Sequence, residues 1–157
     1  MSKLTHVDAR GAARMVDVGE KDVTAREAVA EAVVRMRPAT LRTLKSGRTP
    51  KGDVLAAVRL AGIGAAKRCA ELIPLCHAIP IDAVTIDVTL ERASVRIVAR
   101  ARTHARTGIE MEALTAASVA ALTLYDMLKA IDRSMEIGPV RLLEKRGGRS
   151  GSWQAEA

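Results

Sequence analysis

The chain contains almost no aromatic residues: its 157 residues include one Tyr, one Trp and no Phe. Modules that bind single-stranded RNA or DNA stack bases on exposed aromatic side chains, so this composition disfavours them. A core without aromatic rings is built from small aliphatic side chains, which favours close helix packing and further burial between subunits. The composition therefore favours an oligomer.

Cysteines and long apolar runs are also scarce. The two cysteines, Cys69 and Cys76, fit no Cys-x-x-Cys pattern, and one pair in a chain of this size is not a disulfide framework, so both are expected to be reduced thiols. No stretch approaches the ~20 uninterrupted apolar residues of a membrane span, and the first ten residues lack the apolar region of a signal peptide. These features predict a cytoplasmic protein without a membrane partner.

The balance of charge is basic. Lys and Arg outnumber Asp and Glu by 25 to 18, which gives a net charge of +7. Such a surface attracts anions, among them phosphates, nucleic acid and acidic lipid. The length and an apolar content of 48% suit a single domain, expected over residues 3–146, with a flexible basic glycine-rich tail over residues 147–157.

The apolar pattern predicts both helices and strands. In chain order these are a strand at 15–18, a helix at 25–36 behind the capping-box pattern of Thr24 and Glu27, a helix from Pro38 to near Gly47, an alanine-rich helix from Asp53 with Gly62 and Gly64 as weak or close-contact points, a hairpin over 83–102 that turns at 91–94, a long helix over 110–130 and a strand at 139–145. Helices grouped around an antiparallel sheet indicate an α+β two-layer domain, with a ferredoxin-like arrangement expected.

The long helix is expected to be polar on one side only. One half is unbroken and apolar, which is typical of a core-facing helix; it carries Ala113, Leu114, Ala116, Ala117, Ala120, Ala121, Leu124, Met127, Leu128 and Ile131. On the other half, Val119 and Leu122 interrupt polar residues, which indicates a face that meets a ligand or another chain. The alternative is a solvated surface helix with an ion pair between Asp126 and Lys129.

One loop combines a thiol with an imidazole. In ELIPLCHAIPI, residues 71–81, prolines bracket Cys76 and His77. His77 could form a hydrogen bond to a polar ligand or exchange a proton with it, and the alternative is a structural histidine. No second cluster has metal-ligand spacing, and Glu110 and Glu112 are too few to complete a metal site.

Two further segments carry positive charge at loops. Lys51, in TPKGD, precedes a helix N-terminus, where backbone N–H groups favour phosphate. Lys145, Arg146 and Arg149 lie in EKRGGRSG, where glycines let backbone amides approach an anion. The alternatives are a solvated loop lysine and a disordered basic tail.

Three strings together resemble one known family. KRCAELIPLCHAIPI, TGIEMEALTAASVAALTLYDMLKA and GPVRLLEKRGGRSG are similar, in order and spacing, to the molybdenum cofactor biosynthesis protein C family (MoaC), also called cyclic pyranopterin monophosphate synthase. The resemblance covers nearly the whole chain. It implies a cytosolic ferredoxin-like protomer in a homohexamer, a trimer of dimers, with active sites shared at the dimer interfaces.

The resemblance also implies a reaction. The family is a lyase that converts (8S)-3′,8-cyclo-7,8-dihydroguanosine 5′-triphosphate, supplied by a radical SAM enzyme, to cyclic pyranopterin monophosphate and diphosphate. Such a rearrangement needs proton transfers and positive charge around a triphosphate, which lysines beside a carboxylate can supply. No metal site and no resident cofactor are implied, and whether Mg²⁺ accompanies the triphosphate stays open.

The motifs assign roles residue by residue. The resemblance implies catalytic roles for Asp126, Lys129 and Lys51, and substrate-binding roles for Leu75, Cys76, His77, Glu110, Met111, Glu112 and Lys145. This chain departs from the family at Ala78, where proline is frequent, and at Arg146 and Arg149, which replace a small residue and a lysine.

Helix geometry predicts that two chains build one site. Glu112 and Asp126 are 14 positions apart, which is roughly 20 Å along a helix. We therefore expect His77, Glu110 and Glu112 to come from one chain and Asp126 and Lys129 from its neighbour, with Lys51 unassigned.

A second hypothesis is a basic α+β module that binds RNA or DNA. It rests on the net charge and on four arginines, Arg96, Arg100, Arg102 and Arg106. The same arginines are also compatible with the solvated side of a strand.

Overall fold

The computed structural model describes residue 7 and residues 10–156. Its elements are, in chain order, β1 (Thr24–Arg35), α1 (Pro38–Ser46), α2 (Val54–Lys67), α3 (Cys69–Leu72), β2 (Ala83–Leu90), β3 (Ser94–Ala105), α4 (Glu110–Leu128), β4 (Glu136–Arg146) and β5 (Trp153–Gln154). Residues 3–6 and 8–9 of the predicted domain and residue 157 of the predicted tail lie outside the described residues.

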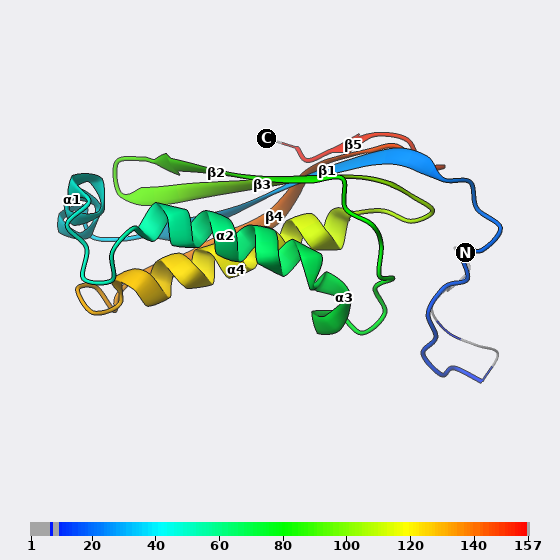
Figure 1. Ribbon diagram of the computed structural model, residues 1–157, viewed down its shortest axis with the longest axis horizontal. Coiled ribbons are helices and arrows are strands. Elements are labelled where there is room, and N and C mark those ends of the chain that lie inside the picture. The colour runs from blue at the N-terminus through cyan, green and yellow to red at the C-terminus, as the bar shows by residue number, and fades with distance from the viewer. Residues whose placement is uncertain (1–6, 8–9, 157) are drawn as a thin grey trace.

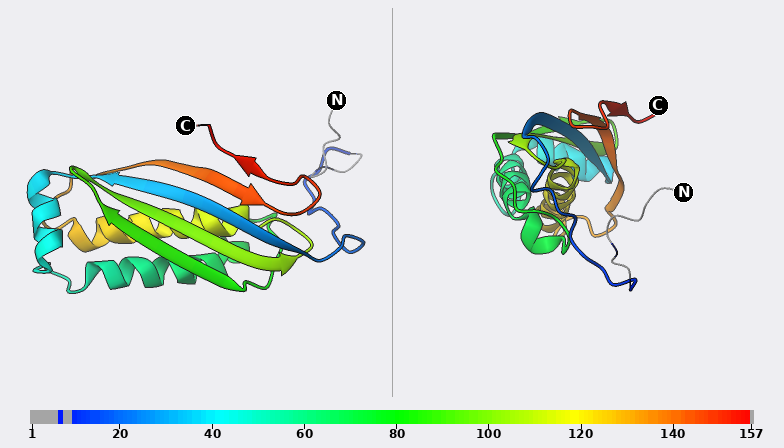
Figure 2. Two further views of the ribbon diagram at one scale, coloured as in Figure 1. Left: turned by 90° about the horizontal axis from the view of Figure 1, so that it is seen from above. Right: turned by 90° about the vertical axis from the view of Figure 1, so that its right-hand side faces the viewer.

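The strands form one antiparallel sheet in the order β2-β3-β1-β4-β5. Figures 1 and 2 show this sheet as one layer and α2 and α4, side by side, as a second layer beneath one of its faces. A strand, helices, a hairpin, a helix and a strand in succession make the ferredoxin-like arrangement, to which β5 adds an edge strand. The predicted α+β two-layer fold is confirmed.

The helix predicted at residues 25–36 is wrong, because these residues form β1, the strand between β3 and β4. Its side chains alternate, and the fully buried ones are Ala28, Ala30, Ala32 and Val34. Alanine and glutamate favour a helix locally, and the capping-box pattern agreed with it. Pairing with two neighbouring strands outweighs that local preference.

The strand predicted at residues 15–18 is also wrong, since these residues have no regular structure. The Val16 carbonyl accepts a hydrogen bond from a side chain, His77 Nε2, at 2.8 Å instead of pairing in a sheet. The segment lies near the first turn of α4, where it lines a cavity.

The other predicted elements are confirmed. α1 begins at Pro38 and ends before Gly47, and α2 begins after Asp53, whose Oδ1 accepts a hydrogen bond from Ala56 N at 2.9 Å. The hairpin is β2 and β3, and the last predicted strand lies within β4. The tail was predicted to be loose, but the free edge of β4 pairs with Trp153 and Gln154.

The core lies between the sheet, α2 and α4. The fully buried alanines of α4 are Ala113, Ala116, Ala117, Ala120 and Ala121. Their small side chains allow close helix packing, and a Cβ at Gly62 of α2 would lie 3.2 Å from the Ala116 carbonyl oxygen. Gly62 is thus a close-contact position, as predicted, whereas Gly64 faces open space.

By length and composition α4 could cross a membrane, whereas the sequence contains no uninterrupted apolar stretch long enough for a membrane span. Half of its apolar window is buried inside the protein, and the core helix of a globular protein passes the same test. Since α4 packs against the sheet and α2, we assign it to the core.

Candidate active site

The predicted site residues lie in two groups at opposite ends of α4. A cavity of about 370 Å³ beside the first turn of α4, the LCH cavity, is lined by six of the predicted substrate-binding residues: Leu75, Cys76, His77, Glu110, Met111 and Glu112. The structure therefore brings together two motifs that are more than thirty residues apart in the sequence.

His77 is held by the segment before β1. Its Nε2 donates a hydrogen bond to the Val16 carbonyl, which can only accept, so this nitrogen carries a proton. In the neutral imidazole, Nδ1 is then left as an acceptor. The loop of His77 is fixed to β3 as well, because Thr103 Oγ1 donates to the Pro80 carbonyl at 2.5 Å. His77 is thus both structurally anchored and part of a cavity wall.

Glu112 is a buried carboxyl group in this cavity, with only 4% of the residue exposed. Burial raises the pKa of Glu112, and the neighbouring Glu110 carboxylate raises it further. The protonated form, which can donate a hydrogen bond, is therefore favoured more than in a solvated glutamate.

The thiols beside Glu112 are not activated. Both cysteines are free, as predicted. Burial, together with the nearby Cys69, raises the pKa of Cys76 to about 11. Because the thiolate is the nucleophile and the metal ligand, Cys76 lines the cavity as a neutral thiol. Among the described residues, no three His, Cys, Asp or Glu side chains form a group that could hold a metal ion.

A second cavity, of about 670 Å³, adjoins the first and shares Lys21, Thr107, Gly108 and Glu110 with it. This basic cavity is lined by five cationic residues, Lys21, Arg26, Arg106, Lys145 and Arg149, and by three acidic ones, Glu20, Asp22 and Glu110. The hydroxyl of Thr24, which also lines it, is buried and has no hydrogen-bond partner in the described structure. Such an orphan donor calls for an additional polar partner, such as a ligand or a water molecule.

Lys145 was predicted to bind substrate, whereas Lys21 and Arg26 were missed. Lys21 belongs to a segment of mixed charge that shows no motif, and Arg26 was assigned to a helix. Only the path of the chain brings them to Lys145, because β1 pairs with β4. A basic residue at the start of a central strand was the one signal available.

The three predicted catalytic residues form the lysine cluster at the other end of α4. Asp126 accepts from Lys51 Nζ at 2.7 Å and from Lys129 Nζ at 2.8 Å. Lys51 Nζ also donates to the Asp126 carbonyl at 2.9 Å. Hydrogen bonds from Lys129 and Lys51 lower the pKa of Asp126 to about 2, so it is ionised at neutral pH.

Lys51 reaches this cluster from the turn between α1 and α2. Gly52, with φ of +85°, adopts the left-handed conformation that this turn requires. Within one chain, Lys51 thus lies beside Asp126 and Lys129. About half of each side chain is exposed: 40% for Lys51, 52% for Asp126 and 51% for Lys129.

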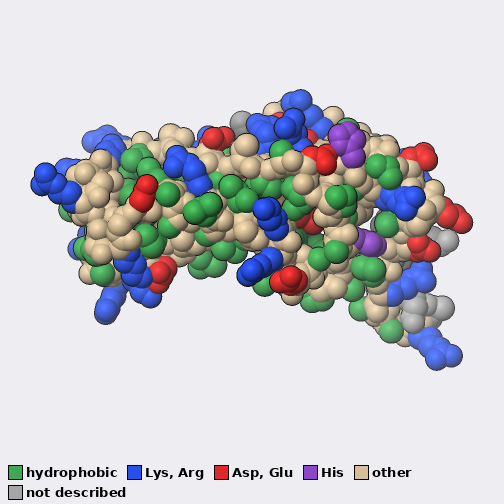
Figure 3. Space-filling model, in the orientation of Figure 1, with side chains coloured by type: hydrophobic (Ala, Val, Ile, Leu, Met, Phe, Trp, Pro, Cys, Tyr) green, Lys and Arg blue, Asp and Glu red, His purple; other side chains and the backbone are tan. Residues whose placement is uncertain are grey.

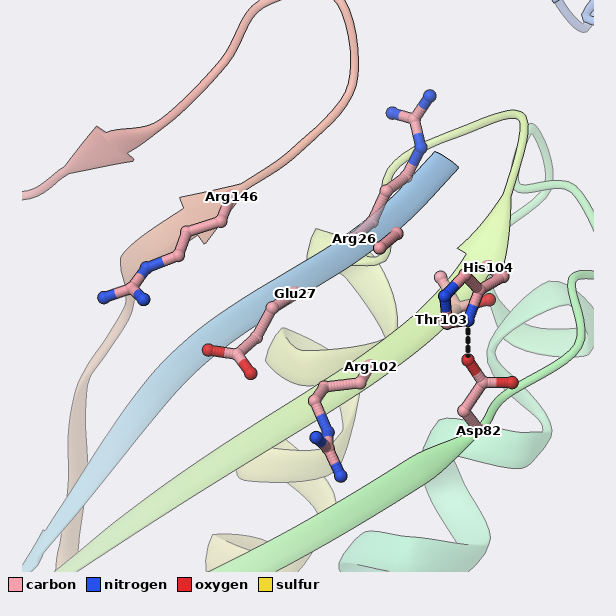
Figure 4. Close-up of a pocket in the computed structure, with 8 residues that line it drawn as sticks. Arg26, Glu27, Asp82, Arg102, Thr103, His104 and Arg146 are labelled. Carbon is pink, nitrogen blue, oxygen red and sulfur yellow. Dashed lines mark hydrogen bonds and ion pairs between the residues drawn. The ribbon is translucent and has the colours of Figure 1, made fainter. Parts of the chain in front are cut away.

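A third cavity, also of about 670 Å³, lies over the strands and contains none of the predicted site residues. Arg26, Arg102 and Arg146 all line it, but Figure 4 shows that they point in different directions and do not converge. Its one close pair is His104 Nδ1 with Asp82 Oδ2, at 2.6 Å. Volume alone therefore does not identify the candidate site.

Comparison with known proteins agrees with the motifs. The model of the MoaC family matches residues 15–148. The cyclic pyranopterin monophosphate synthase of Roseiflexus sp. strain RS-1 is 61% identical over 155 residues, covering 98% of each chain. That of Thermomicrobium roseum is 58% identical over 158 residues, covering 99% of this chain and 95% of the relative.

A relative from a third organism gives the same result. Cyclic pyranopterin monophosphate synthase 1 of Mycobacterium tuberculosis is 59% identical over 155 residues, covering 98% of this chain and 91% of the relative. The family match covers far more than half of the chain, and these relatives align over almost all of it. This chain belongs to the MoaC family.

Proposed function

We propose that this chain acts in molybdenum cofactor biosynthesis and converts (8S)-3′,8-cyclo-7,8-dihydroguanosine 5′-triphosphate to cyclic pyranopterin monophosphate, with release of diphosphate. The relatives carry the name of this synthase. The observation that carries the proposal is that a cavity lined by both substrate-binding motifs adjoins a cavity lined by five cationic residues. That pair of cavities suits a polar ring attached to a triphosphate.

The triphosphate occupies the basic cavity. Lys21, Arg26 and Lys145 can neutralise its charge, and the unpartnered Thr24 hydroxyl can donate to a phosphate oxygen. The ring derived from guanine occupies the LCH cavity, where the polar edges of Glu112 and His77 are available to it. Because the two cavities share a wall, one molecule can reach both.

The lysine cluster performs the chemistry. A substrate hydroxyl attacks the α-phosphorus, its proton passes to a base, and the bond from the α-phosphorus to the diphosphate oxygen breaks. The two ammonium groups beside Asp126 stabilise the negative charge that develops on the phosphate oxygens. Asp126, ionised and bonded to both, fixes their positions, and Lys129 acts as acid and base in the ring rearrangement.

Each site takes residues from two chains. The lysine cluster lies roughly 20 Å along α4 from Glu112, too far for the LCH cavity of about 370 Å³ to include both. Val119 is midway between the two, and Leu122, one turn further on, is 57% exposed. Figure 3 shows apolar side chains among basic ones on the face of the molecule over α2, which lies beside α4.

A two-fold axis near Val119 explains these features. It pairs two α4 helices in opposite directions, so that Glu112 of one protomer faces Asp126 of the partner subunit. Three such dimers form the proposed homohexamer. The enzyme works in the cytoplasm on substrate supplied by a radical SAM enzyme, without a resident cofactor, and Mg²⁺ is an optional companion of the triphosphate. Nucleic acid and membrane are not partners in this proposal.

The competing nucleic-acid hypothesis loses part of its support. Arg96 pairs with Glu31 at 2.6 Å and Arg100 with Glu27 at 2.7 Å, so two of its four arginines are neutralised on the sheet. Arg106 lines the basic cavity instead. The arginines therefore do not form one free basic stripe for a phosphate backbone.

The decisive test is direct. The purified protein is incubated with the cyclised dihydroguanosine triphosphate, and the products are identified by mass spectrometry. Cyclic pyranopterin monophosphate and diphosphate should appear in equal amounts. A folded protein that leaves the substrate unchanged, and binds duplex DNA with a steep salt dependence, would instead favour the nucleic-acid module.

A further inference from the structure

Asp132 is a buried carboxylate that lies outside both cavities and outside the lysine cluster. Only 1% of the residue is exposed, less than for Glu31 or Glu112. It follows the end of α4 by four positions, in the turn that leads to β4. A charge buried this deeply is costly unless it is fully hydrogen-bonded, so its partners are informative.

Both carboxylate oxygens of Asp132 accept hydrogen bonds. Oδ2 accepts from Thr40 Oγ1 at 2.8 Å and from Arg37 N at 3.1 Å. Oδ1 accepts from Ser134 Oγ at 2.6 Å and from Ser134 N at 3.1 Å, and it lies 3.1 Å from Arg37 Nε. Burial raises the pKa of Asp132, but these hydrogen bonds outweigh it and hold the pKa far below its usual range.

These bonds join α1 to the end of α4. Arg37 is the N-cap residue of α1 and makes no side-chain cap bond of its own; its backbone N–H instead donates to Asp132 Oδ2. Arg37 Nη2 adds a bond to the Ile131 carbonyl at 2.5 Å. Figure 2 shows α1 standing across the end of the molecule, next to the start of α2 and the end of α4.

The same two segments carry the lysine cluster. α1 leads through Gly47 into the turn that holds Lys51, whereas α4 ends at Asp126 and Lys129. The cluster is half exposed, so little packing holds it in place. The hydrogen bonds of Asp132 thus form a buried connection between two segments: α1, which precedes Lys51, and the turn that follows Lys129.

We infer that Asp132 is a positioning residue for the reaction: by clamping the start of α1 to the end of α4, it keeps Lys51 within reach of Asp126. This rests on the proposed function, since it assigns a role to the geometry of the lysine cluster. The hydrogen bonds of its side chain go to Arg37, Thr40 and Ser134 and not to the cluster. A displacement of about 1 Å in a catalytic group can reduce turnover up to a hundredfold.

The test is Asp132→Asn, which keeps the size of the side chain. Because an amide has one accepting oxygen, its NH2 group must face donors either from Arg37 and Thr40 or from Ser134. The matched control is Glu31→Gln, which changes another buried carboxylate, bonded to Arg96 and Arg141 at 2.6 and 2.7 Å on the sheet. Both variants are assayed well below their melting temperatures.

For Asp132→Asn we expect kcat to fall about tenfold while KM stays within about twofold, because the substrate-binding cavities lie at the other end of α4. Glu31→Gln should retain the wild-type kcat at a comparable loss of Tm. A wild-type kcat in folded Asp132→Asn, or an equal loss of kcat in the control, would overturn the inference.

If Asp132→Asn does not fold, Thr40→Val replaces it, since this variant removes a single bond to the carboxylate. Its kcat should fall about threefold with KM unchanged, and an unchanged kcat would also overturn the inference. An inactive wild-type protein is a separate result, because it refutes the proposed function first and the positioning role with it.

Discussion

The two ends of α4 carry carboxyl groups with opposite properties. Glu112, in the first turn, is 4% exposed, and burial raises its pKa. Asp126, near the last turn, has a side chain that is 52% exposed, and Lys129 and Lys51 lower its pKa to about 2. One helix therefore presents a carboxyl group whose pKa is raised and a second that remains an anion at neutral pH.

The helix dipole alone predicts the reverse. An anion is favoured at a helix N-terminus and disfavoured at the C-terminus, by about 0.3–1 kcal/mol at exposed positions. Glu112 overrides this because the LCH loop and the segment around Val16 enclose it. Asp126 overrides it because two ammonium groups lie within 2.8 Å. Local burial sets the pKa of Glu112, and direct charge contacts set that of Asp126.

This contrast assigns different tasks to the two ends. A carboxyl group with a raised pKa suits recognition of a polar ring, since its protonated form can donate as well as accept. A permanent anion between lysines suits the fixing of cations for phosphate chemistry. The proposed site joins one end from each of two chains.

The largest effect is expected at the lysine cluster. Lys51→Ala and Lys129→Ala should abolish turnover and leave folding intact, because both side chains are about half exposed and lie outside the apolar core. Lys45→Ala, which removes an exposed lysine from the last turn of α1, is the control and should keep full activity. Steady-state kinetics and thermal melts measure both properties. If either cluster variant keeps a near wild-type kcat, or melts much earlier than the wild type, its catalytic assignment is wrong.

The shared site is tested by mixing two inactive proteins. Glu112→Ala and Asp126→Ala each damage one end of α4, so hybrid dimers contain one site with both lesions and one with neither. With random pairing half of the dimers are hybrids, and roughly a quarter of the wild-type activity should return. Mixing each variant with itself is the control. Proven subunit exchange without recovered activity would contradict the shared site and leave Glu112 to act within its own chain.

The sequence predicted those elements whose form depends on residues close together in the chain. The β2–β3 hairpin alternates without ambiguity, α1 is bounded by Pro38 and Gly47, and the apolar half of α4 is the buried one. β1 was missed because AREAVAEAVV satisfies both a helical and an alternating reading. Its partners, β3 and β4, follow it by some sixty and more residues, beyond the reach of any local pattern.

The candidate site shows the same division. The motifs contain the predicted residues of the LCH cavity and of the lysine cluster. Each predicted site residue lies in one of these two places or in the basic cavity. Lys21, Arg26 and the carbonyl of Val16 were missed, because their roles depend on where the chain passes and not on residue type. Likewise, only the fold shows that Asp132 joins α4 to α1.

A moderate effect is expected in the basic cavity. Lys145→Ala should weaken substrate binding about tenfold, chiefly through the triphosphate, because it removes a charge-assisted hydrogen bond. The loss should shrink as salt screens the charge. Arg141→Ala, on the same strand but paired with Glu31, is the control. Calorimetric titrations with GTP at low and high ionic strength provide the measurement, and unchanged affinity at low ionic strength would contradict the assignment.

The smallest effect concerns stability, and it compares the two carboxyl groups directly. A carboxyl group with a raised folded pKa stabilises the protein below its unfolded pKa of about 4.3, and this contribution is lost as the pH rises through the folded value. At pH 8, Glu112→Gln removes a buried charge and should raise Tm by roughly 2–4 °C, equivalent to about 1 kcal/mol. At pH 4 the gain should disappear, since Glu112 is then largely protonated in the folded wild type.

Asp126→Asn should behave in the opposite way. A depressed pKa stabilises the protein above the unfolded value, about 3.9, and this contribution is lost as the pH falls through about 2. The variant should therefore lower Tm slightly at pH 8, by a small amount because the pair is exposed, and the difference should shrink below pH 4. Thermal melts of both variants from pH 3 to pH 8 measure this. If Glu112→Gln lowers Tm equally at pH 4 and pH 8, its carboxyl group serves as a structural hydrogen-bond partner, and the contrast between the two ends of α4 is not one of charge.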